Sequence, residues 1–266
     1  MIVINSGAYV NQEFRNELGA IPPCFLPLGN KKLLQHQVES LAQFTTETIV
    51  VSLPESYELS LDERALVQSL GLKVVVVPDN FTLGEAITYV LNVSASNDQG
   101  VRLLHGDTLI WDLPNDSDIL TVGHTIDEYN WEIENTDSDD DTLVWSGFFS
   151  FSSQKTFLKA LSLCRGNFVE AVRAYSEDFA LKTYSSEHWF DLGHINTYFS
   201  SRSKITTQRS FNDLRIETGL VYKTGYPTVK IEAEEKWFKS VPFEIKKYTP
   251  HLIDSGCLRM GGGFMY

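Results

Sequence analysis

The chain has 266 residues, of which 42% are hydrophobic and 21% charged, a composition typical of a soluble globular protein that excludes fibrous and low-complexity classes. Asp and Glu number 35 against 22 Lys and Arg, so the formal charge is −13 and no nucleic-acid partner is expected. An acidic chain that handles phosphates usually does so through Mg²⁺, because carboxylates bind the ion and the ion binds the phosphate.

The cysteines and the apolar segments exclude further classes. The three cysteines form no C-x-x-C pair, which indicates neither a disulfide framework nor a structural zinc site. No run of 18 apolar residues occurs, and Met1–Gly7 does not resemble a signal peptide. We therefore expect a cytoplasmic protein with no membrane partner.

Short runs rich in Val and Ile alternate with segments of helical spacing over residues 1–110. The expected strands are Ile2–Ile4, Thr48–Leu53, Lys73–Val77 and Val101–Leu104. The expected helices contain the apolar pattern of Leu33, Leu34, Gln37, Val38 and Leu41, then Leu61–Leu70 and Gly84–Asn92. This alternation predicts an α/β fold with a Rossmann-like, mostly parallel sheet flanked by helices.

The pattern changes after Asp107. An acidic run of Asp137, Asp139, Asp140 and Asp141 is interpreted as a solvated hairpin turn, with metal binding as the alternative. A strand at Leu143–Phe151 and helices at Lys155–Leu163 and Asn167–Tyr175 follow. The last expected elements are strands at Leu214–Glu217, Leu220–Lys223 and Thr228–Ile231 and a helix at Glu232–Ser240. We predict one domain over residues 1–205 and a small α+β segment over 206–266.

Two glycine-containing segments are candidate nucleotide contacts. The first strand runs through Asn5 into Ser6-Gly7, and a glycine at the carboxyl end of a strand lets backbone N–H groups approach a base or phosphate. Gly84 and Glu85 stand at the start of an expected helix, where a ligand can also approach closely. A plain turn and an ordinary helix start are the respective alternatives.

Two aspartates end expected strands that are distant in sequence, Asp107 after Leu103-Leu104-His105-Gly106 and Asp191 after Trp189-Phe190. Carboxylates placed in this way can converge on one Mg²⁺, which takes oxygen ligands and leaves positions free for phosphates. Each could instead be a turn or cap residue. Of the six histidines only His105, beside Gly106-Asp107, is placed to take part.

Taken in order, these segments resemble the nucleotidyltransferase superfamily that includes the sugar-1-phosphate nucleotidylyltransferases. The resemblance spans roughly residues 1–203 and rests on the order and spacing of its motifs. They are Phe25-Leu26-Pro27-Leu28-Gly29-Asn30-Lys31-Lys32-Leu33-Leu34, Leu83-Gly84-Glu85-Ala86, Gly106-Asp107, Ser146-Gly147-Phe148-Phe149-Ser150-Phe151, and Trp189-Phe190-Asp191-Leu192-Gly193 with Tyr198.

The resemblance implies a nucleotide-diphospho-sugar transferase type of fold and a Mg²⁺-dependent enzyme of the kind used in polysaccharide biosynthesis. It would transfer a nucleotidyl group from a nucleoside triphosphate to a sugar phosphate or similar small phosphorylated acceptor and release pyrophosphate. The implied roles are metal binding and catalysis for Asp107 and Asp191, nucleotide binding for Asn5, Ser6, Gly7, Gly84 and Glu85, and acceptor binding for Gly147 and Trp189.

The sequence departs from this pattern at its expected cations. Pro23 stands where the family carries its catalytic lysine, and the loop after Gly7 reads Ala8-Tyr9-Val10-Asn11 without the usual arginine. Loss of that lysine would remove several kcal/mol of transition-state stabilisation. Arg15, Lys31 or Lys32 could supply the charge instead. The alternative function is a non-catalytic sensor or scaffold that binds a nucleotide or sugar.

The C-terminal segment resembles the amino-terminal lobe of a choline-kinase or aminoglycoside-phosphotransferase type kinase. Lys223 on an expected strand, with Glu234 or Glu235 on the following helix, resembles the pair with which such lobes hold nucleotide phosphates. A solvated hairpin with an amphipathic helix is the alternative. No catalytic loop of that kinase class follows, so we expect the chain to be the front part of a fused enzyme whose C-terminal kinase lobe is missing.

Overall fold

The computed structural model describes residues 1–43, 45–94, 100–125, 133–134, 142–205, 212–217, 220–225, 228–249, 251–258 and 261–265. The chain forms two compact units, Met1–Pro27 with Lys31–Tyr198, and Leu28–Asn30 with Phe199–Tyr266. The domain boundary predicted at residue 205 stays a prediction. The acidic run from Asp137 to Asp141 lies outside the described residues, so its interpretation stays a prediction.

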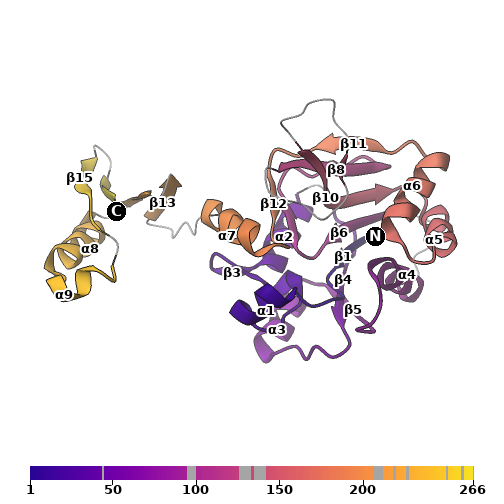
Figure 1. The fold of residues 1–266 in the computed structure, drawn as a ribbon, viewed down its shortest axis with the longest axis horizontal. Coiled ribbons are helices and arrows are strands. Elements are labelled where there is room, and N and C mark those ends of the chain that lie inside the picture. Colours follow the sequence, from indigo (N-terminus) through magenta and orange to yellow (C-terminus); the bar gives the residue numbers. More distant parts are fainter. Residues whose placement is uncertain are drawn as a thin grey trace. The chain divides into compact units, whose positions relative to one another are not determined.

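A sheet with the strand order β5-β4-β1-β6-β10-β8-β11 is the centre of the first unit (Figure 1), and β9 pairs with β10. The strands are β1 (Ile2–Asn5), β4 (Ile49–Pro54), β5 (Lys73–Val77), β6 (Val101–His105), β8 (Ile119–Thr125), β9 (Ile133–Glu134), β10 (Thr142–Phe151) and β11 (Lys182–Ser185). Strands β5, β4, β1 and β6 are parallel, whereas β10 runs antiparallel to β6 and β8. The predicted α/β fold with a mostly parallel sheet is confirmed.

Helices cover both faces of this sheet (Figure 1). They are α2 (Leu33–Leu41), α3 (Leu61–Ser69), α4 (Leu83–Val93), α5 (Gln154–Leu163) and α6 (Phe168–Asp178). The chain also forms α1 (Gln12–Leu18) and a short 3₁₀ helix η1 (Pro23–Phe25), and α7 (Ile195–Lys204) crosses the division between the two units. Because successive strand residues point to opposite faces, Val3 packs with α4, α5 and α6, while Ile2 and Ile4 pack with α2 and α3. The near-continuous apolar runs of the central strands follow from this burial on both faces.

Local sequence signals fix the ends of several helices. Ser60 and Glu63 form a capping box at the start of α3, and Thr82 and Glu85 form another at the start of α4.

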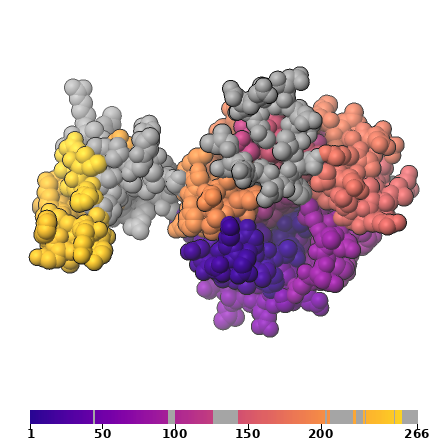
Figure 2. Space-filling model, viewed as in Figure 1, coloured from indigo at the N-terminus to yellow at the C-terminus, as the bar shows by residue number. Residues whose placement is uncertain are grey.

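On the face shown in Figure 2, the indigo N-terminal segment borders the purple and magenta segments that follow it in the chain. The surface part of the N-terminal segment thus lies beside the βα segments that follow it.

Two short strands outside the main sheet bring Asp191 close to Asp107. Strand β12 (Trp189–Asp191) pairs antiparallel with β7 (Thr108–Ile110), and Asp191 lies opposite Thr108 in this register. The remaining short pair of the first part of the chain is β2 (Pro27–Leu28) with β3 (Lys31–Lys32). The β7–β12 pairing places Asp191 beside the residue that follows Asp107.

The second unit contains a four-stranded antiparallel sheet with the order β13-β14-β16-β15, together with helices that follow β14. The elements are β13 (Asn212–Glu217), β14 (Leu220–Gly225), α8 (Thr228–Ser240), α9 (Phe243–Lys246), β15 (Asp254–Leu258) and β16 (Gly261–Met265).

The predicted strand at Thr228–Ile231 is wrong, because these residues form the first turn of α8. In a strand Val229 and Ile231 would share one face, but Val229 is 70% exposed and Ile231 only 3%. The helical period, not the β-branched composition, therefore decides the structure of this segment.

Among the described residues, no helix is long and apolar enough to cross a membrane.

Candidate active site

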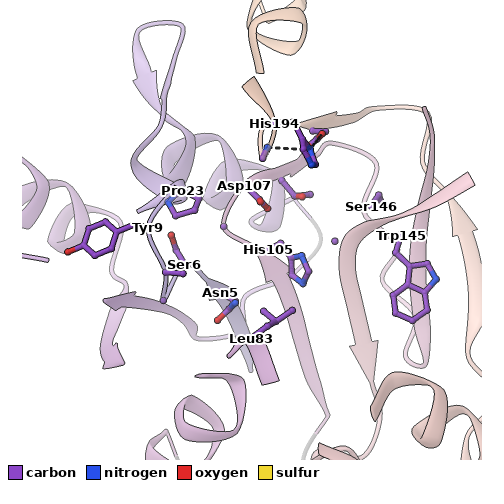
Figure 3. A pocket seen from close by; sticks show the side chains of 17 residues that line it. Asn5, Ser6, Tyr9, Pro23, Leu83, His105, Asp107, Trp145, Ser146 and His194 are labelled. Atoms are coloured by element: carbon purple, nitrogen blue, oxygen red, sulfur yellow. Dashed lines mark hydrogen bonds and ion pairs between the residues drawn. The ribbon is translucent and has the colours of Figure 1, made fainter. Parts of the chain in front are cut away.

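A cavity of about 350 Å³ opens at the carboxyl ends of β1 and β6, the edge of a parallel sheet where α/β proteins bind their ligands (Figure 3). The described residues that line it are Asn5, Ser6, Gly7, Ala8, Tyr9, Pro23, Leu83, His105, Gly106, Asp107, Thr108, Trp145, Ser146, Gly147, Asp191, Gly193 and His194. The cavity collects most of the predicted site residues in one place.

The turn after β1 is held by a buried serine on the neighbouring strand. Ser52 Oγ accepts a hydrogen bond of 2.9 Å from the Ser6 amide and donates one of 3.2 Å to Asn5 Oδ1. Ser6 Oγ in turn accepts the Cys24 amide at 3.0 Å, which ties the turn to η1. A Cβ at Gly7 would stand 3.4 Å from Ser52 Oγ, so this turn lies close against β4. The predicted nucleotide residues Asn5, Ser6 and Gly7 therefore form one fixed wall.

Asp107 follows β6 in a two-residue turn whose backbone is fixed on both sides. The Gly106 amide donates to Asn5 O at 2.8 Å, and the Leu192 amide donates to Asp107 O at 2.9 Å. A Cβ at Gly106 would stand 2.7 Å from Ser6 Cβ, so only glycine allows this approach to the β1 turn. Asp107 thereby enters the centre of the cavity (Figure 3).

Asp191, at the end of β12, is 8% exposed and well hydrogen-bonded. Its Oδ1 accepts the Gly193 amide at 2.8 Å, and its Oδ2 lies 2.8 Å from both Thr197 Oγ1 and His194 Nδ1. These contacts fix the Asp191 side chain, with Oδ1 facing Gly193.

The two aspartates converge beside Gly193. A Cβ on this glycine would lie 2.6 Å from Asp107 Oδ2 and 3.3 Å from Asp191 Oδ1, so both oxygens lie close to one point in the cavity. Burial, and after it the negative charge of Asp191, raise the pKa of Asp107 to about 6. No group of three or more His, Cys, Asp or Glu side chains in the described part of the chain is arranged to hold a metal.

His105, which the sequence singled out beside Gly106-Asp107, lines the cavity from the end of β6. Its ring lies 5.7 Å from that of Phe149 and 5.8 Å from that of Phe168, between centroids. Burial lowers the pKa of this histidine to about 4, so the imidazole is neutral at pH 7. His105 therefore brings polarity but no positive charge.

The opposite wall comes from a bulge in β10, where the register with β8 shifts between Trp145 and Phe149. Gly147 has a φ of +96°, and a Cβ there would stand 2.8 Å from Thr108 Oγ1. Glycine is thus required both by the backbone conformation and by the close approach of β7. The predicted acceptor residue Gly147 lines the cavity.

Gly84 and Glu85 are not among the described lining residues, and their predicted nucleotide role stays a prediction. Gly84 packs on the α5–α6 loop, where a Cβ would stand 2.1 Å from Gly166 O. Glu85 Oε2 accepts hydrogen bonds of 2.8 Å from both the amide and the hydroxyl of Thr82, which makes it a helix-capping residue. The segment reaches the cavity through Leu83 instead.

Trp189, predicted as an acceptor contact, is likewise absent from the described lining. Its ring covers Gly123 on β8, where a Cβ would stand 2.0 Å from a ring carbon. It also packs with the apolar cluster that includes Ile110 and Phe148. Trp145 lines the cavity in its place.

Pro23 lines the cavity where the family resemblance implies a lysine, and no Lys or Arg belongs to the lining in the described ranges. The three candidate substitutes have other partners. Arg15 Nε donates to Val10 O at 3.0 Å, Lys31 Nζ donates to Glu39 at 2.6 Å, and Lys32 Nζ lies 3.9 Å from Glu63.

We expect Arg15→Ala, Lys31→Ala and Lys32→Ala each to leave ligand binding and turnover within about two- to threefold of wild type, because none of these side chains lines the described cavity and each bonds another group. Steady-state kinetics and calorimetric titration with nucleotides would measure this. A loss of a hundredfold or more in any one variant would show that this cation reaches the ligand.

The raised pKa of Asp107 predicts a pH-dependent stability in metal-free protein. The folded state keeps the proton between pH 4 and 6 while the unfolded state has lost it, so stability falls as pH rises through this window. The loss levels off above pH 6 at about 3 kcal/mol. Urea unfolding between pH 4 and 7 should therefore show the stability of wild type falling by this amount relative to Asp107→Asn, because the opposite contribution of His105, whose pKa burial lowers to about 4, is shared by both proteins. Equal slopes in the two proteins would contradict the assignment.

In the second unit, Lys223 on β14 bonds Glu234 on α8. The Lys223 side chain is 15% exposed and that of Glu234 is 33% exposed. Glu235, the alternative partner, bonds Lys239 and accepts the Ser255 hydroxyl at 2.8 Å. The strand lysine and helix glutamate are brought together, and their role in holding a nucleotide stays a prediction.

Several lining residues were not singled out by sequence reasoning, notably Tyr9, Leu83, Thr108, Trp145 and His194. His194 directly follows the Asp191-Leu192-Gly193 motif, which was the available signal for it. Ser52, which fixes the β1 turn, interrupts an apolar strand and is fully buried. A buried serine in a strand leaves no signal about its partner in a distant loop.

No protein-family model matches the chain, and no curated protein matches it in sequence. Solved structures of nucleotidyltransferases share its fold over about three quarters of its length. A nucleoside-diphosphate-sugar pyrophosphorylase from Vibrio cholerae is 16% identical with a TM-score of 0.57, covering 76% of this chain and 99% of that one. The CTP:phosphocholine cytidylyltransferase of Streptococcus pneumoniae is 13% identical with a TM-score of 0.57, covering 76% and 97% respectively.

A UTP-bound UGPase from Acinetobacter baumannii is 14% identical with a TM-score of 0.52, and the match covers 76% of this chain and 91% of that one. At such identities the likeness shows the fold, which is that of nucleotidyltransferases and confirms this part of the resemblance. These comparisons give no support to the kinase resemblance of the C-terminal segment.

Proposed function

We propose that the first unit catalyses Mg²⁺-dependent nucleotidyl transfer from a nucleoside triphosphate to a sugar phosphate or similar small phosphorylated acceptor, with release of pyrophosphate. The observation that carries this proposal is the convergence of Asp107 and Asp191 in a cavity at the carboxyl ends of parallel strands. The nucleotidyltransferase fold supports it, and so do neighbours whose ligands include UTP and phosphocholine.

Asp107 and Asp191 would hold the Mg²⁺. Two carboxylates suit a hard cation that also accepts phosphate and water oxygens. The fit is supported by the space that Gly193 leaves, which a Cβ would fill, and by the raised pKa of Asp107, because a cation between the carboxylates would relieve their repulsion. When bound, Mg²⁺ would neutralise and orient the phosphates of the nucleotide.

The residues of the chain itself would mainly position the reactants. The turn of Asn5, Ser6 and Gly7 would hold the nucleotide, and Ser146 with Gly147 would face the acceptor across the cavity. An acceptor phosphate oxygen would attack the α-phosphorus in line, and the bond to the β-phosphate oxygen would break as pyrophosphate leaves. Such a step needs alignment and charge neutralisation but no nucleophilic side chain. Because burial keeps His105 neutral, this residue of the cavity would not take up a proton near pH 7.

The second candidate function is a non-catalytic sensor or scaffold for a nucleotide or sugar. It is favoured by one observation, the absence of Lys and Arg from the described lining with Pro23 in the lysine position. Preorganised positive charge at the transferring phosphoryl group is a large part of catalysis in such reactions. A cavity without it would retain binding more easily than turnover.

Pyrophosphate release, assayed over the common nucleoside triphosphates and a panel of sugar phosphates and phosphorylated amino alcohols, separates the two functions. Turnover that requires Mg²⁺ and disappears in Asp107→Asn supports the enzyme. Nucleotide or sugar binding without turnover over the whole panel supports the sensor. Neither binding nor turnover would contradict both functions.

The second unit could serve as the amino-terminal lobe of a kinase fused to the first unit, as its pairing of Lys223 with Glu234 supports. Such a lobe binds nucleotide in a cleft against a second lobe, so the chain by itself should show no phosphotransferase activity. Addition of a phosphorylatable amino alcohol with ATP would test this, and product formation would contradict it.

Deletion of residues 206–266 is expected to leave the folding and nucleotide binding of residues 1–205 intact, because both core clusters lie wholly within the first unit. Circular dichroism and calorimetric titration of the truncated protein would measure this. Unfolding, or a loss of nucleotide binding, would show that the C-terminal segment belongs to the first domain.

A further inference from the structure

Gln37 on α2 is a fully buried polar residue that contacts the backbone on both sides of Asp107. Its Nε2 donates one hydrogen bond of 3.0 Å to His105 O and another of 2.8 Å to Thr108 O. Between these carbonyls stand only Gly106 and Asp107. One side-chain amide therefore bridges the turn that carries the predicted metal ligand.

The orientation of this amide follows from its partners. Backbone carbonyls only accept hydrogen bonds, so the nitrogen and both of its hydrogens must face them. The side-chain oxygen, Gln37 Oε1, is buried and has no hydrogen-bond partner among the described residues. A buried unpaired acceptor is unfavourable, and an apolar side chain would avoid it. The two hydrogen bonds that Gln37 donates are therefore the reason for a glutamine at this buried position.

These bonds act where position matters most. The turn that carries Asp107 toward Asp191 is fixed by three sets of hydrogen bonds. The Gly106 amide donates to Asn5 O, and the Leu192 amide donates to Asp107 O. Gln37 donates to the two carbonyls that flank the turn. Small movements of a ligand carboxylate change the affinity of a metal site, and residues that orient ligands contribute strongly to that affinity. Gln37 is the one of these contacts that comes from a side chain of α2, on the far side of the turn from β12.

We propose that Gln37 is a positioning residue that holds the Gly106–Asp107 turn against Leu192 and thereby sets the affinity of the Asp107–Asp191 pair for a divalent cation. The metal part of this inference rests on the proposed function, whereas the position of the turn does not. Gln37 touches neither substrate nor metal and acts through Asp107.

Ser40, one turn further along α2, offers a matched control. It is buried like Gln37, and its hydroxyl also donates to a backbone carbonyl of β7, that of Ile110. Ile110 lies beyond the turn, at the other end of β7. Ser40→Ala should therefore weaken the packing of α2 on β7 without releasing Asp107.

The test compares wild type, Gln37→Met and Ser40→Ala in the full chain. Methionine keeps the length and burial of the side chain but removes both donated bonds and the unpaired acceptor. We expect Gln37→Met to speed amide hydrogen exchange at Leu192 by about tenfold or more, and to weaken Mn²⁺ binding, measured by electron paramagnetic resonance, by about ten- to a hundredfold. Ser40→Ala should change both quantities by less than about threefold, whatever its effect on the unfolding midpoint.

The two measurements separate this inference from the proposed function. If wild type binds no Mn²⁺, the proposed function fails, and Leu192 exchange alone decides whether Gln37 fixes the turn. Unchanged exchange and Mn²⁺ affinity in a folded Gln37→Met protein would overturn the inference, and so would equal losses in Ser40→Ala. Should Gln37→Met not fold, Gln37→Asn can replace it, because asparagine keeps the amide but retracts it by one methylene. We expect Gln37→Asn also to speed amide exchange at Leu192 and to weaken Mn²⁺ binding.

Discussion

Asp107→Asn is expected to lower nucleotidyl transfer by about a thousandfold or more while leaving the fold intact. Asparagine occupies the same volume but carries no charge, so the pair of carboxylate oxygens beside Gly193 would be reduced to one. The substitution also removes a carboxyl group whose ionisation is opposed by burial and, after it, by the charge of Asp191, so the metal-free variant should be at least as stable as wild type above pH 6. Pyrophosphate release, Mg²⁺-dependent nucleotide binding and urea unfolding would be measured together.

Asp191→Asn should give a similar loss of turnover with a larger cost in stability, since Asp191 accepts hydrogen bonds from Gly193 and Thr197. Asp62→Asn is a control for a general change of charge, because Asp62 lies exposed in the first turn of α3. The metal assignment would be wrong if Asp107→Asn kept turnover and Mg²⁺-dependent binding within about threefold of wild type while folded.

Gly84→Ala is expected to cause the largest loss of stability among single-methyl additions in the α4 region. The added Cβ would stand 2.1 Å from the carbonyl oxygen and 2.7 Å from the carbonyl carbon of Gly166, so α4 or the α5–α6 loop must move. Because the clash is between the core helix α4 and backbone atoms of the α5–α6 loop, we expect a loss of about 3 kcal/mol or more in the free energy of unfolding. Thermal and urea unfolding would measure it.

The same variant distinguishes packing from ligand binding at this position. If Gly84 contacted the base, Gly84→Ala would weaken nucleotide binding with little change in stability. The structure leads us to expect the opposite at a temperature where the variant is folded. Glu85→Gln tests the neighbouring residue, and its effect should be limited to the stability of α4, because Glu85 is exposed and caps that helix.

The strands of the central sheet could be predicted because their sequences carry the signal of burial on both faces. Val3, Val50 and Leu103 pack on one face and Ile2, Ile4 and Val51 on the other, which leaves short runs rich in Val, Ile and Leu. The convergence of Asp107 with Asp191 could be anticipated for a related reason, since residues at the carboxyl ends of strands meet at one edge of a sheet.

The direction in which a side chain or a glycine faces could not be predicted. Gly84 and Trp189 stand in segments that border the cavity, yet each packs on a neighbouring element, on Gly166 and on Gly123 respectively. Such contacts depend on elements distant in the chain, about which a local motif carries no information. For the same reason the strand expected at Thr228–Ile231 proved to be helix, because burial of one helical face outweighed local β propensity.

The pairing of β7 with β12 also sets when the cavity can form as the chain folds. Strands β1, β4, β5 and β6 come from the first 105 residues, whereas Asp191 joins Asp107 only after α5, α6 and β11 have been placed. Closing so long a loop costs conformational entropy before the new contacts repay it, so the β7–β12 pair should form late. A partly synthesised chain would then hold a nearly complete sheet with a single carboxylate at its edge. Under the proposed function, such a chain could not bind a divalent cation and a triphosphate at this edge before the rest of the unit had folded.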